Sequence, residues 1–160
     1  MFTGFFGTSE NSIDDKNRLI IPARFRNELG NRFMLTKGFD KCLYIYKMED
    51  YEVLVNKMRK LPQSDRDIRK FIREFFANTE ICEADSQWRI KVPVNLRKYA
   101  GIDDKEGKRI QKDLVISGAM DKIEIWTAAE LESSDGGNMM DNDEFVAKLQ
   151  SFTKETDYAI

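Results

Sequence analysis

Two short stretches carry the residue types best suited to binding an anion. The first is DDKNR, in which Asp14 lies four residues before Arg18, and the second is DSQWR, in which Asp85 lies four residues before Arg89. An aspartate that opens a turn accepts hydrogen bonds from backbone N–H groups two residues on. An arginine offers a forked pair of donors to a phosphate or to the edge of a guanine. Further basic residues stand near the two stretches: Lys16, Arg24 and Arg26 near the first, and Arg97 after the second.

A purely structural role is the alternative for each stretch. The aspartate would cap its turn, and the arginine would pair with it across four residues. This accounts well for Asp14 and Asp85. It does not explain why Lys16 lies in the same turn as Asp14 and Arg18, with Arg24 and Arg26 close by in the sequence.

The two stretches belong to a repeated unit with an offset of 71 residues. Four other residues return at the same offset: Thr8, Pro22, Arg26 and Gly30 match Thr79, Pro93, Arg97 and Gly101. In each copy a turn leads into a short extended segment that a proline ends, and a short helix follows with glycine as its stop. In the second helix we expect Leu96 and Ala100 to point inward, and Arg97 and Lys98 to point outward.

Each copy ends with two more extended segments around an Asp-Lys turn. These turns begin at Asp40 and Asp121, which are 81 residues apart, so the second copy contains about ten extra residues, 103–112. Their lysines and glycine predict an exposed loop. Because a hairpin and one short helix cannot enclose their own apolar face, the two copies should pack on each other about a pseudo-two-fold axis.

Two helices are predicted between the copies. Residues 48–61 place their apolar side chains on one stripe, and residues 65–77 follow Pro62, with Ser64 as the expected N-cap and Asp67 in the capping-box position. The second helix also has a basic stripe: Arg66, Arg69, Lys70 and Arg73. A solvated helix face is the favoured interpretation of this stripe, and contact with phosphate or with a neighbouring subunit is the alternative.

Composition and charge limit the classes of function. The chain has 160 residues, 41% hydrophobic and 34% charged, and contains no histidine, which removes the commonest general base and metal ligand. Cys42 and Cys82 are isolated, so we expect two reduced thiols and no metal site. The formal net charge is −2, yet residues 1–127 carry 24 basic and 20 acidic side chains. The acidic excess lies in residues 128–160, where SSDGGN (133–138) suggests a hinge and 142–154 a short helix with Phe145, Leu149 and Phe152 inward.

No stretch approaches the roughly 20 apolar residues that a membrane-spanning helix needs. The first ten residues lack the basic region and long apolar run of a signal peptide. We therefore expect a cytoplasmic protein that has no membrane partner.

The sequence closely resembles the MraZ family. The resemblance runs from residue 1 to about residue 127 and is carried by MFTG, IDDKNRLIIPARFRNELG, GFDKCLYIY, the second D-x-x-x-R-I-x-V-P-x-N-L-R-x-Y-A-G pattern and the ending IEIW. It implies two fused AbrB-type (SpoVT-AbrB) units with a swapped-hairpin fold. It also implies a bacterial DNA-binding transcriptional regulator that forms rings and binds G-rich direct repeats upstream of division and cell-wall genes.

The resemblance implies that DNA is contacted by the D-x-x-x-R turns, here Asp14 to Arg18 and Asp85 to Arg89. The family usually has glycine before the arginine, whereas this chain has Asn17 and Trp88. Asparagine tolerates the left-handed conformation and tryptophan adopts it only at a cost, so the second turn is expected to differ in shape. It also has Gln87 in place of Lys16, and we therefore expect Arg89 to contribute less than Arg18.

The predicted fold class is α+β, with tandem swapped-hairpin AbrB-like units forming a pseudo-two-fold barrel, two connecting helices and an acidic C-terminal tail. The expected divisions are 7–51 for the first unit, 52–79 for the helical connector, 80–127 for the second unit and 128–160 for the tail.

The predicted partners are double-stranded DNA at the nucleoid and further copies of the chain in a closed ring. The DNA-binding set is Asp14, Lys16, Arg18, Arg24, Arg26, Asp85, Arg89 and Arg97. No cofactor, metal, small-molecule substrate or enzymatic activity is expected. Two alternatives stay open: a protein–protein interaction module of the same fold, antitoxin-like or scaffolding, and an enzyme that gathers Asp14, Asp15 and Asp85 in a deep pocket.

Overall fold

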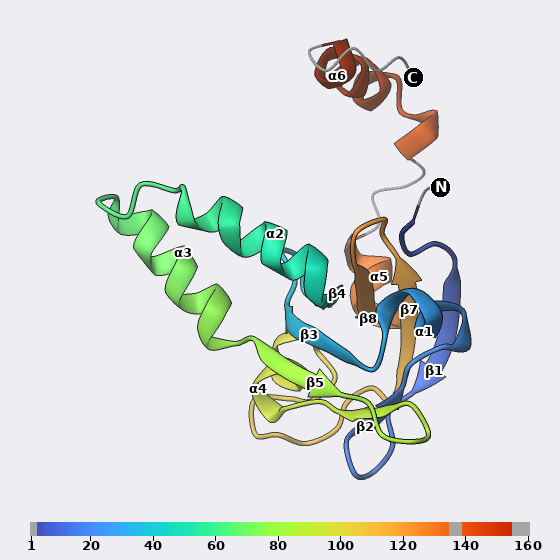
Figure 1. Ribbon diagram of the computed structural model, residues 1–160. Helices are drawn as coiled ribbons and strands as arrows, with labels where there is room; N and C mark the ends of the chain where they lie inside the picture. Colours follow the sequence, from blue (N-terminus) through green and yellow to red (C-terminus); the bar gives the residue numbers. More distant parts are fainter. Residues whose placement is uncertain (1–2, 135–138, 155–160) are drawn as a thin grey trace. The chain divides into compact units, whose positions relative to one another are not determined.

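The computed structural model describes residues 3–134 and 139–154. The chain divides into two compact units, Met1–Glu130 and Leu131–Ile160. The strands of the first unit are β1 (Thr8–Ser12), β2 (Arg18–Ile20), β3 (Arg32–Lys37), β4 (Leu43–Lys47), β5 (Glu80–Glu83), β6 (Arg89–Lys91), β7 (Asp113–Gly118) and β8 (Ile123–Thr127). Its helices are α1 (Ala23–Leu29), α2 (Met48–Arg59), α3 (Arg66–Ala77) and α4 (Val94–Tyr99). Figure 1 shows their course.

Six of the strands form one antiparallel sheet in the order β1-β7-β8-β4-β3-β5. The order is symmetric, because β4 and β8 pair at the centre while β1 of the first repeat pairs with β7 of the second, and β5 of the second pairs with β3 of the first. Each repeat thus contributes strands to the other. Within the described part of the chain the sheet is open, so the expected closed barrel is not seen.

The strands that follow the two D-x-x-x-R turns pair with each other. In this two-stranded ribbon β2 runs antiparallel to β6, with Leu19 opposite Ile90 at the centre and Arg18 opposite Lys91. Leu19 and Ile90 are equivalent residues of the two repeats, so their pairing places the pseudo-two-fold relation between them. The paired strands connect the two turns directly (Figure 1).

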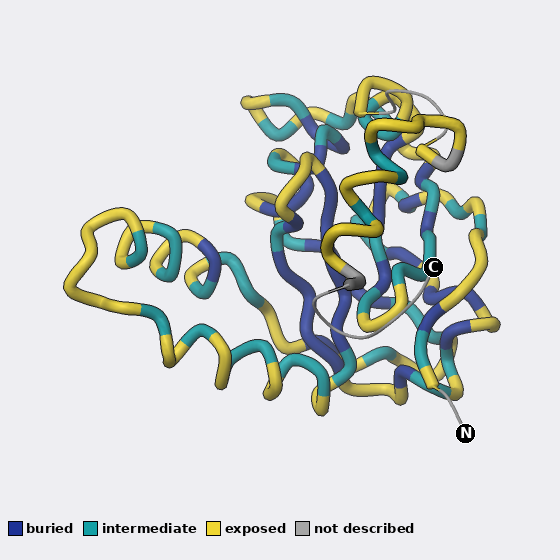
Figure 2. The backbone as a smooth tube through the Cα atoms, turned by 90° about the horizontal axis from the view of Figure 1, so that it is seen from above, coloured by how far each residue is buried: buried dark blue, intermediate teal, exposed yellow. Residues whose placement is uncertain are grey.

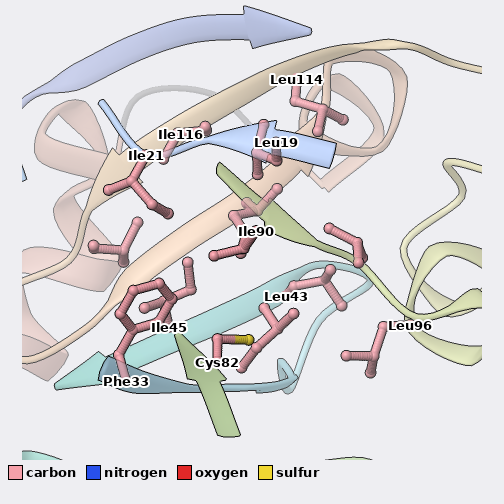
Figure 3. Close-up of a cluster of buried hydrophobic side chains, with 14 of the residues drawn as sticks. Leu19, Ile21, Phe33, Leu43, Ile45, Cys82, Ile90, Leu96, Leu114 and Ile116 are labelled. Carbon is pink, nitrogen blue, oxygen red and sulfur yellow. The ribbon is translucent and has the colours of Figure 1, made fainter. Parts of the chain in front are cut away.

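One hydrophobic core serves both repeats. The predicted packing of the two copies on each other is confirmed, because apolar residues from each copy lie in a single buried cluster: Leu19, Ile21, Phe25 and Leu29 from the first, and Ile90, Val92, Leu96 and Ala100 from the second. Figure 3 shows side chains from β2, β6 and the large sheet meeting in this interior. The turns are therefore carried by a shared, well-packed base.

Helices α2 and α3 form a hairpin in which Tyr51 and Phe76 meet edge to face, with ring centroids 6.4 Å apart. Helix α2 is slightly shorter than expected and buries none of its side chains, and α3 buries only Phe75. Figure 2 shows this hairpin as mostly exposed beside the buried strands. The N-cap of α3 is Asp65 and not Ser64, because the Asp65 carboxylate accepts from the backbone N–H groups of Asp67 and Ile68.

After residue 127 the chain forms α5 (Ala128–Ser134), a short 3-10 turn (Met139–Asp141) and α6 (Asp143–Lys154). Phe145 and Leu149 are half-buried, whereas Phe152 is exposed, so its expected inward position is wrong. The predicted hinge at 133–138 falls largely outside the described residues.

Candidate nucleic-acid interface

The first D-x-x-x-R stretch forms a closed turn around the Asp14 carboxylate. Its Oδ1 atom accepts from the backbone N–H of Lys16 at 2.9 Å and of Arg18 at 2.8 Å, and its Oδ2 atom accepts from Arg18 Nε at 2.8 Å. The backbone N–H of Arg18 contributes most to a lowered pKa of Asp14, and together with the Arg18 guanidinium and the Lys16 N–H it outweighs the opposing effect of burial. Asp14 therefore stays ionised at neutral pH and is unsuited to act as a general acid.

The second turn repeats this geometry around Asp85. Oδ1 accepts from the N–H of Gln87 and of Arg89, each at 2.9 Å, and Oδ2 accepts from Arg89 Nε at 2.7 Å. The residues before the arginines have nearly the same left-handed φ, 65° for Asn17 and 58° for Trp88. The expectation that the second turn differs in shape is thus wrong.

Packing accounts for a tryptophan in a conformation that costs an ordinary L-residue roughly 1–2 kcal/mol. Trp88 is half-buried against the shared core, and the Arg26 guanidinium lies 5.6 Å from the centre of its ring. The same guanidinium donates from Nε to the Ile21 carbonyl at 2.9 Å. Arg26 therefore has a structural role in supporting the second turn.

Both turns leave the ends of their arginines available. Arg18 and Arg89 use Nε to hold their aspartates, and their terminal NH1 and NH2 groups make no hydrogen bond within the described residues. The side chains are 33% and 26% exposed. The aspartate thus orients each guanidinium while its two outer nitrogens stay free, which suits two-pronged donation to guanine O6 and N7 or to a phosphate.

A groove of about 540 Å³ lies beside the β2–β6 ribbon. Its charged lining comes from both turns and from neighbouring strands: Lys16, Arg18, Arg89 and Lys91 are basic, and Glu80, Glu83 and Asp85 are acidic. Asp14 and Asp15 do not line it. The groove therefore does not gather the three carboxylates that the enzyme alternative requires.

The predicted residues of the two helices differ in their placement. Arg24, at the start of α1, is exposed and lies over Gly7, where a side chain would overlap its NH1 atom. Arg97 is only 9% exposed, so the expected outward orientation is wrong. Arg97 Nε lies 2.7 Å from Asp103 Oδ2, and its NH1 group donates to the Val92 carbonyl. Arg97 therefore supports the buried interior and does not face the interface.

The aspartate that holds Arg97 comes from the inserted segment 103–112, which the sequence predicts to be an exposed loop. Asp103 is only 3% exposed. Burial raises its pKa, but the hydrogen bonds and charges of Arg97 and Arg109 outweigh that effect, so the pKa is lowered overall. Arg109 Nε donates to Asp103 Oδ1 at 2.7 Å.

Arg109 also reaches the first turn. Its NH1 group donates to the Asp14 carbonyl at 3.2 Å, and its NH2 group donates to Asn17 Oδ1. The amide of Asn17, where the family resemblance expects glycine, is thus the acceptor that links the first turn to the insertion. In the sequence, the features that indicate this link are a polar residue at a position where the family has glycine and an insertion rich in basic residues.

Comparison with known proteins settles the family. The model described as "MraZ protein, putative antitoxin-like" matches residues 4–74 and again residues 75–134. The chain belongs to the MraZ family. Each matched segment of this MraZ-family chain contains one of the two turns, at Asp14–Arg18 and at Asp85–Arg89.

Curated relatives cover most of the chain. One from Alkaliphilus metalliredigens is 40% identical over 91% of this chain and 96% of its own, and one from Pelotomaculum thermopropionicum is 43% identical over 91% and 94%. A third, from Caldicellulosiruptor bescii, is 46% identical over 76% and 79%. All three are named "Transcriptional regulator MraZ", and these are not enzyme names, in agreement with the prediction that the chain is not an enzyme. Among the described residues, no helix is long and apolar enough to cross a membrane.

Proposed function

We propose that this MraZ-family chain is a DNA-binding transcriptional regulator that recognises G-rich direct repeats through its two D-x-x-x-R turns. The single observation that carries the proposal is the matched pair of turns on one ribbon, each holding an arginine by Nε and leaving its outer nitrogens free. The names of the relatives support the same class of function.

The physical basis is the shape of the ribbon and the division of work among its side chains. A two-stranded β-ribbon fits the major groove of B-form DNA, where guanine presents two acceptors to an arginine fork. Arg18 and Arg89 would read bases, and Lys16 and Arg24 would hold phosphates and set the register. Because the two turns share one geometry, the remaining reason for a weaker second turn is Gln87 in place of Lys16.

The oligomeric part of the proposal is a closed ring of swapped-hairpin units. It is supported by the helical hairpin, where Val53 is 53% exposed. A cavity of about 200 Å³ there is lined by Arg59 and Gln63 and by four apolar residues: Val55, Met58, Ile72 and Phe76. Apolar surface of this kind is typical of subunit contacts. A ring that presents several ribbons to spaced repeats gains affinity through high effective concentration. Such a regulator acts in the cytoplasm, at the nucleoid.

The test is a titration of two duplexes, one carrying G-rich direct repeats and one with the same bases scrambled. We call the ratio of the two affinities the discrimination. Arg18→Ala and Arg89→Ala should each lower the discrimination by about 5-fold to 150-fold, the equivalent of 1–3 kcal/mol for one bidentate base contact, with the smaller loss for Arg89→Ala. Lys16→Ala should weaken both affinities equally, and Lys60→Ala, an exposed change at the end of α2, should alter neither.

An unchanged discrimination in folded Arg18→Ala and Arg89→Ala would show that the turns are structural. Failure of the unaltered chain to bind either duplex at 50 mM salt would support the protein–protein interaction module instead. The acidic lining of the groove, Glu80 and Glu83, is the feature that would favour that outcome.

A further inference from the structure

The insertion contains a third turn with the same backbone N–H hydrogen bonds as the two D-x-x-x-R turns, but without the bond from the fifth side chain to the aspartate. Asp104 Oδ1 accepts from the backbone N–H of Glu106 at 3.0 Å and of Lys108 at 2.9 Å. The Asp104 N–H donates to the Lys108 carbonyl at 2.8 Å, and the Gly107 N–H donates to the Asp104 carbonyl at 3.0 Å. Gly107 has φ 85°, the counterpart of the left-handed Asn17 and Trp88. In this third turn, Asp104–Lys108, the lysine stands in the position of Arg18 and Arg89.

The third turn is attached to the first turn and has no counterpart beside the second. Arg109 joins the two by its bonds to the Asp14 carbonyl and to Asn17 Oδ1, and the Ile13 N–H donates to the Lys112 carbonyl at 2.8 Å. In the other repeat the equivalent bond runs from the Ala84 N–H to the Asn31 carbonyl, also at 2.8 Å. There the chain passes from α1 to β3 through only Gly30 and Asn31, without a third turn.

The third turn and the residues that follow it up to Lys112 present more basic than acidic side chains to solvent, with Glu106 as the exposed carboxylate and Asp104 half-buried. Asp103 is buried and neutralised by Arg97 and Arg109, whereas the side chains of Lys105, Lys108 and Lys112 are exposed. Lys108 forms no ion pair within residues 3–134 and 139–154. Since a lysine acts as a compact point charge and lacks the arginine fork, it suits a phosphate better than a guanine edge.

We propose that the third turn is a phosphate-binding element that extends the DNA contact of the first turn, with Lys108 as its main contact. This inference rests on the proposed function and adds an asymmetry to it. The half of the interface around Arg18 contacts more phosphates of the DNA backbone than the half around Arg89. Arg109 is the positioning residue, because it fixes the third turn against the first.

The test uses Lys108→Ala in the full chain, with Lys60→Ala as the control and the repeat and scrambled duplexes as probes. The turn depends on the backbone N–H of residue 108 and not on its side chain, so the variant should fold as the parent does. Each lost phosphate contact should flatten the dependence of log affinity on log salt by about 0.9. Between 50 and 200 mM salt, that is a roughly 3.5-fold smaller drop in affinity.

Two further measurements sharpen the assignment. Glu106→Lys places in the third turn the cation that Lys16 supplies in the first, so it should steepen the salt dependence by a similar amount. Ethylation interference identifies the phosphates whose modification blocks binding to the repeat duplex. Lys108→Ala should require fewer of them than the parent, and the difference should lie on one side of each bound unit. The discrimination should stay unchanged in both variants, because phosphate contacts do not distinguish sequences.

The outcomes separate this inference from the proposed function. Suppose that Lys16→Ala flattens the dependence of log affinity on log salt, while Lys108→Ala and Glu106→Lys leave it at the parental value. The third turn then only supports the fold of the first turn, and the inference is overturned. If Lys108→Ala lowers the discrimination, the turn reads bases and the phosphate assignment is wrong. If the unaltered chain binds neither duplex, both proposals fail together.

Discussion

The buried ion pair between Arg97 and Asp103 should be a major support of the fold. Removing one partner of such a pair leaves an uncompensated buried charge, which costs about 3–5 kcal/mol. Asp103 keeps its bond to Arg109 at 2.7 Å, so we expect Arg97→Ala to fall at the lower end, about 3 kcal/mol. For a unit the size of Met1–Glu130, about 4 °C of melting temperature corresponds to each kcal/mol, so the melting temperature should fall by about 12 °C.

The assay is thermal unfolding followed by circular dichroism, with Lys98→Ala as the matched control. Lys98 is the next residue of α4 and is exposed, so its replacement should change stability by less than about 0.5 kcal/mol. DNA titrations at a temperature where Arg97→Ala is folded should give the parental discrimination. A melting temperature equal to that of Lys98→Ala, together with lost discrimination, would refute this reasoning and restore Arg97 to the DNA-binding set.

The same ion pair predicts that the free energy of unfolding falls at acidic pH. The pKa of Asp103 is lowered in the folded state from its ordinary value of 3.8, so at intermediate pH the unfolded chain binds more protons than the folded one. The stability that Asp103 contributes is therefore complete above its unfolded pKa and is lost as the pH falls through its folded pKa. Asp103→Asn should be less stable at pH 7 and should lose less stability on acidification below pH 4.

Two further predictions concern packing and thiol chemistry. A methyl group at Gly118 would lie 2.3 Å from the backbone carbonyl carbon of Phe5, so Gly118→Ala should lower the free energy of unfolding in urea by about 3 kcal/mol. The control Ser117→Ala, next to it in β7, should lower it by less than about 1 kcal/mol. Equal losses for the two variants would argue against the close approach of Phe5. Burial raises the pKa of Cys42 to about 12 and that of Cys82 to about 11. At pH 8 the thiolate fraction in the folded protein should therefore be roughly 1000-fold lower than in urea for Cys42 and roughly 100-fold lower for Cys82, and labelling by iodoacetamide should slow accordingly. Rapid labelling of the folded chain would contradict this.

Much of the architecture could be predicted because it is carried by local chemistry repeated at a fixed offset. The turn-forming aspartates, the prolines that end the short strands and the apolar spacing of Phe25 and Leu29 each act within a few residues. Two copies of such a unit leave few ways to bury their apolar faces. The shared core around Leu19 and Ile90 therefore followed from the repeat.

What could not be predicted depends on contacts between distant residues. The orientation of Arg97 is decided by Asp103, whose burial follows from the path of the insertion and not from the pattern of α4. The shape of the second turn is decided by the packing of Trp88 on the core and under Arg26, which outweighs its local preference. The open sheet likewise depends on how the outer strands β1 and β5 pair, and period-two patterning does not specify that.

The pairing of β2 with β6 inside one chain has a consequence for orientation on DNA. In a homodimer of single units, every substitution would appear on both sides of the two-fold axis, and the assembly would bind a site and its reverse equally well. A covalent tether removes that constraint, since Asn17 and Trp88, or Lys16 and Gln87, occupy equivalent places without being alike. A ribbon with two unlike ends has polarity, and a polar ribbon can align with the direction of a tandem array.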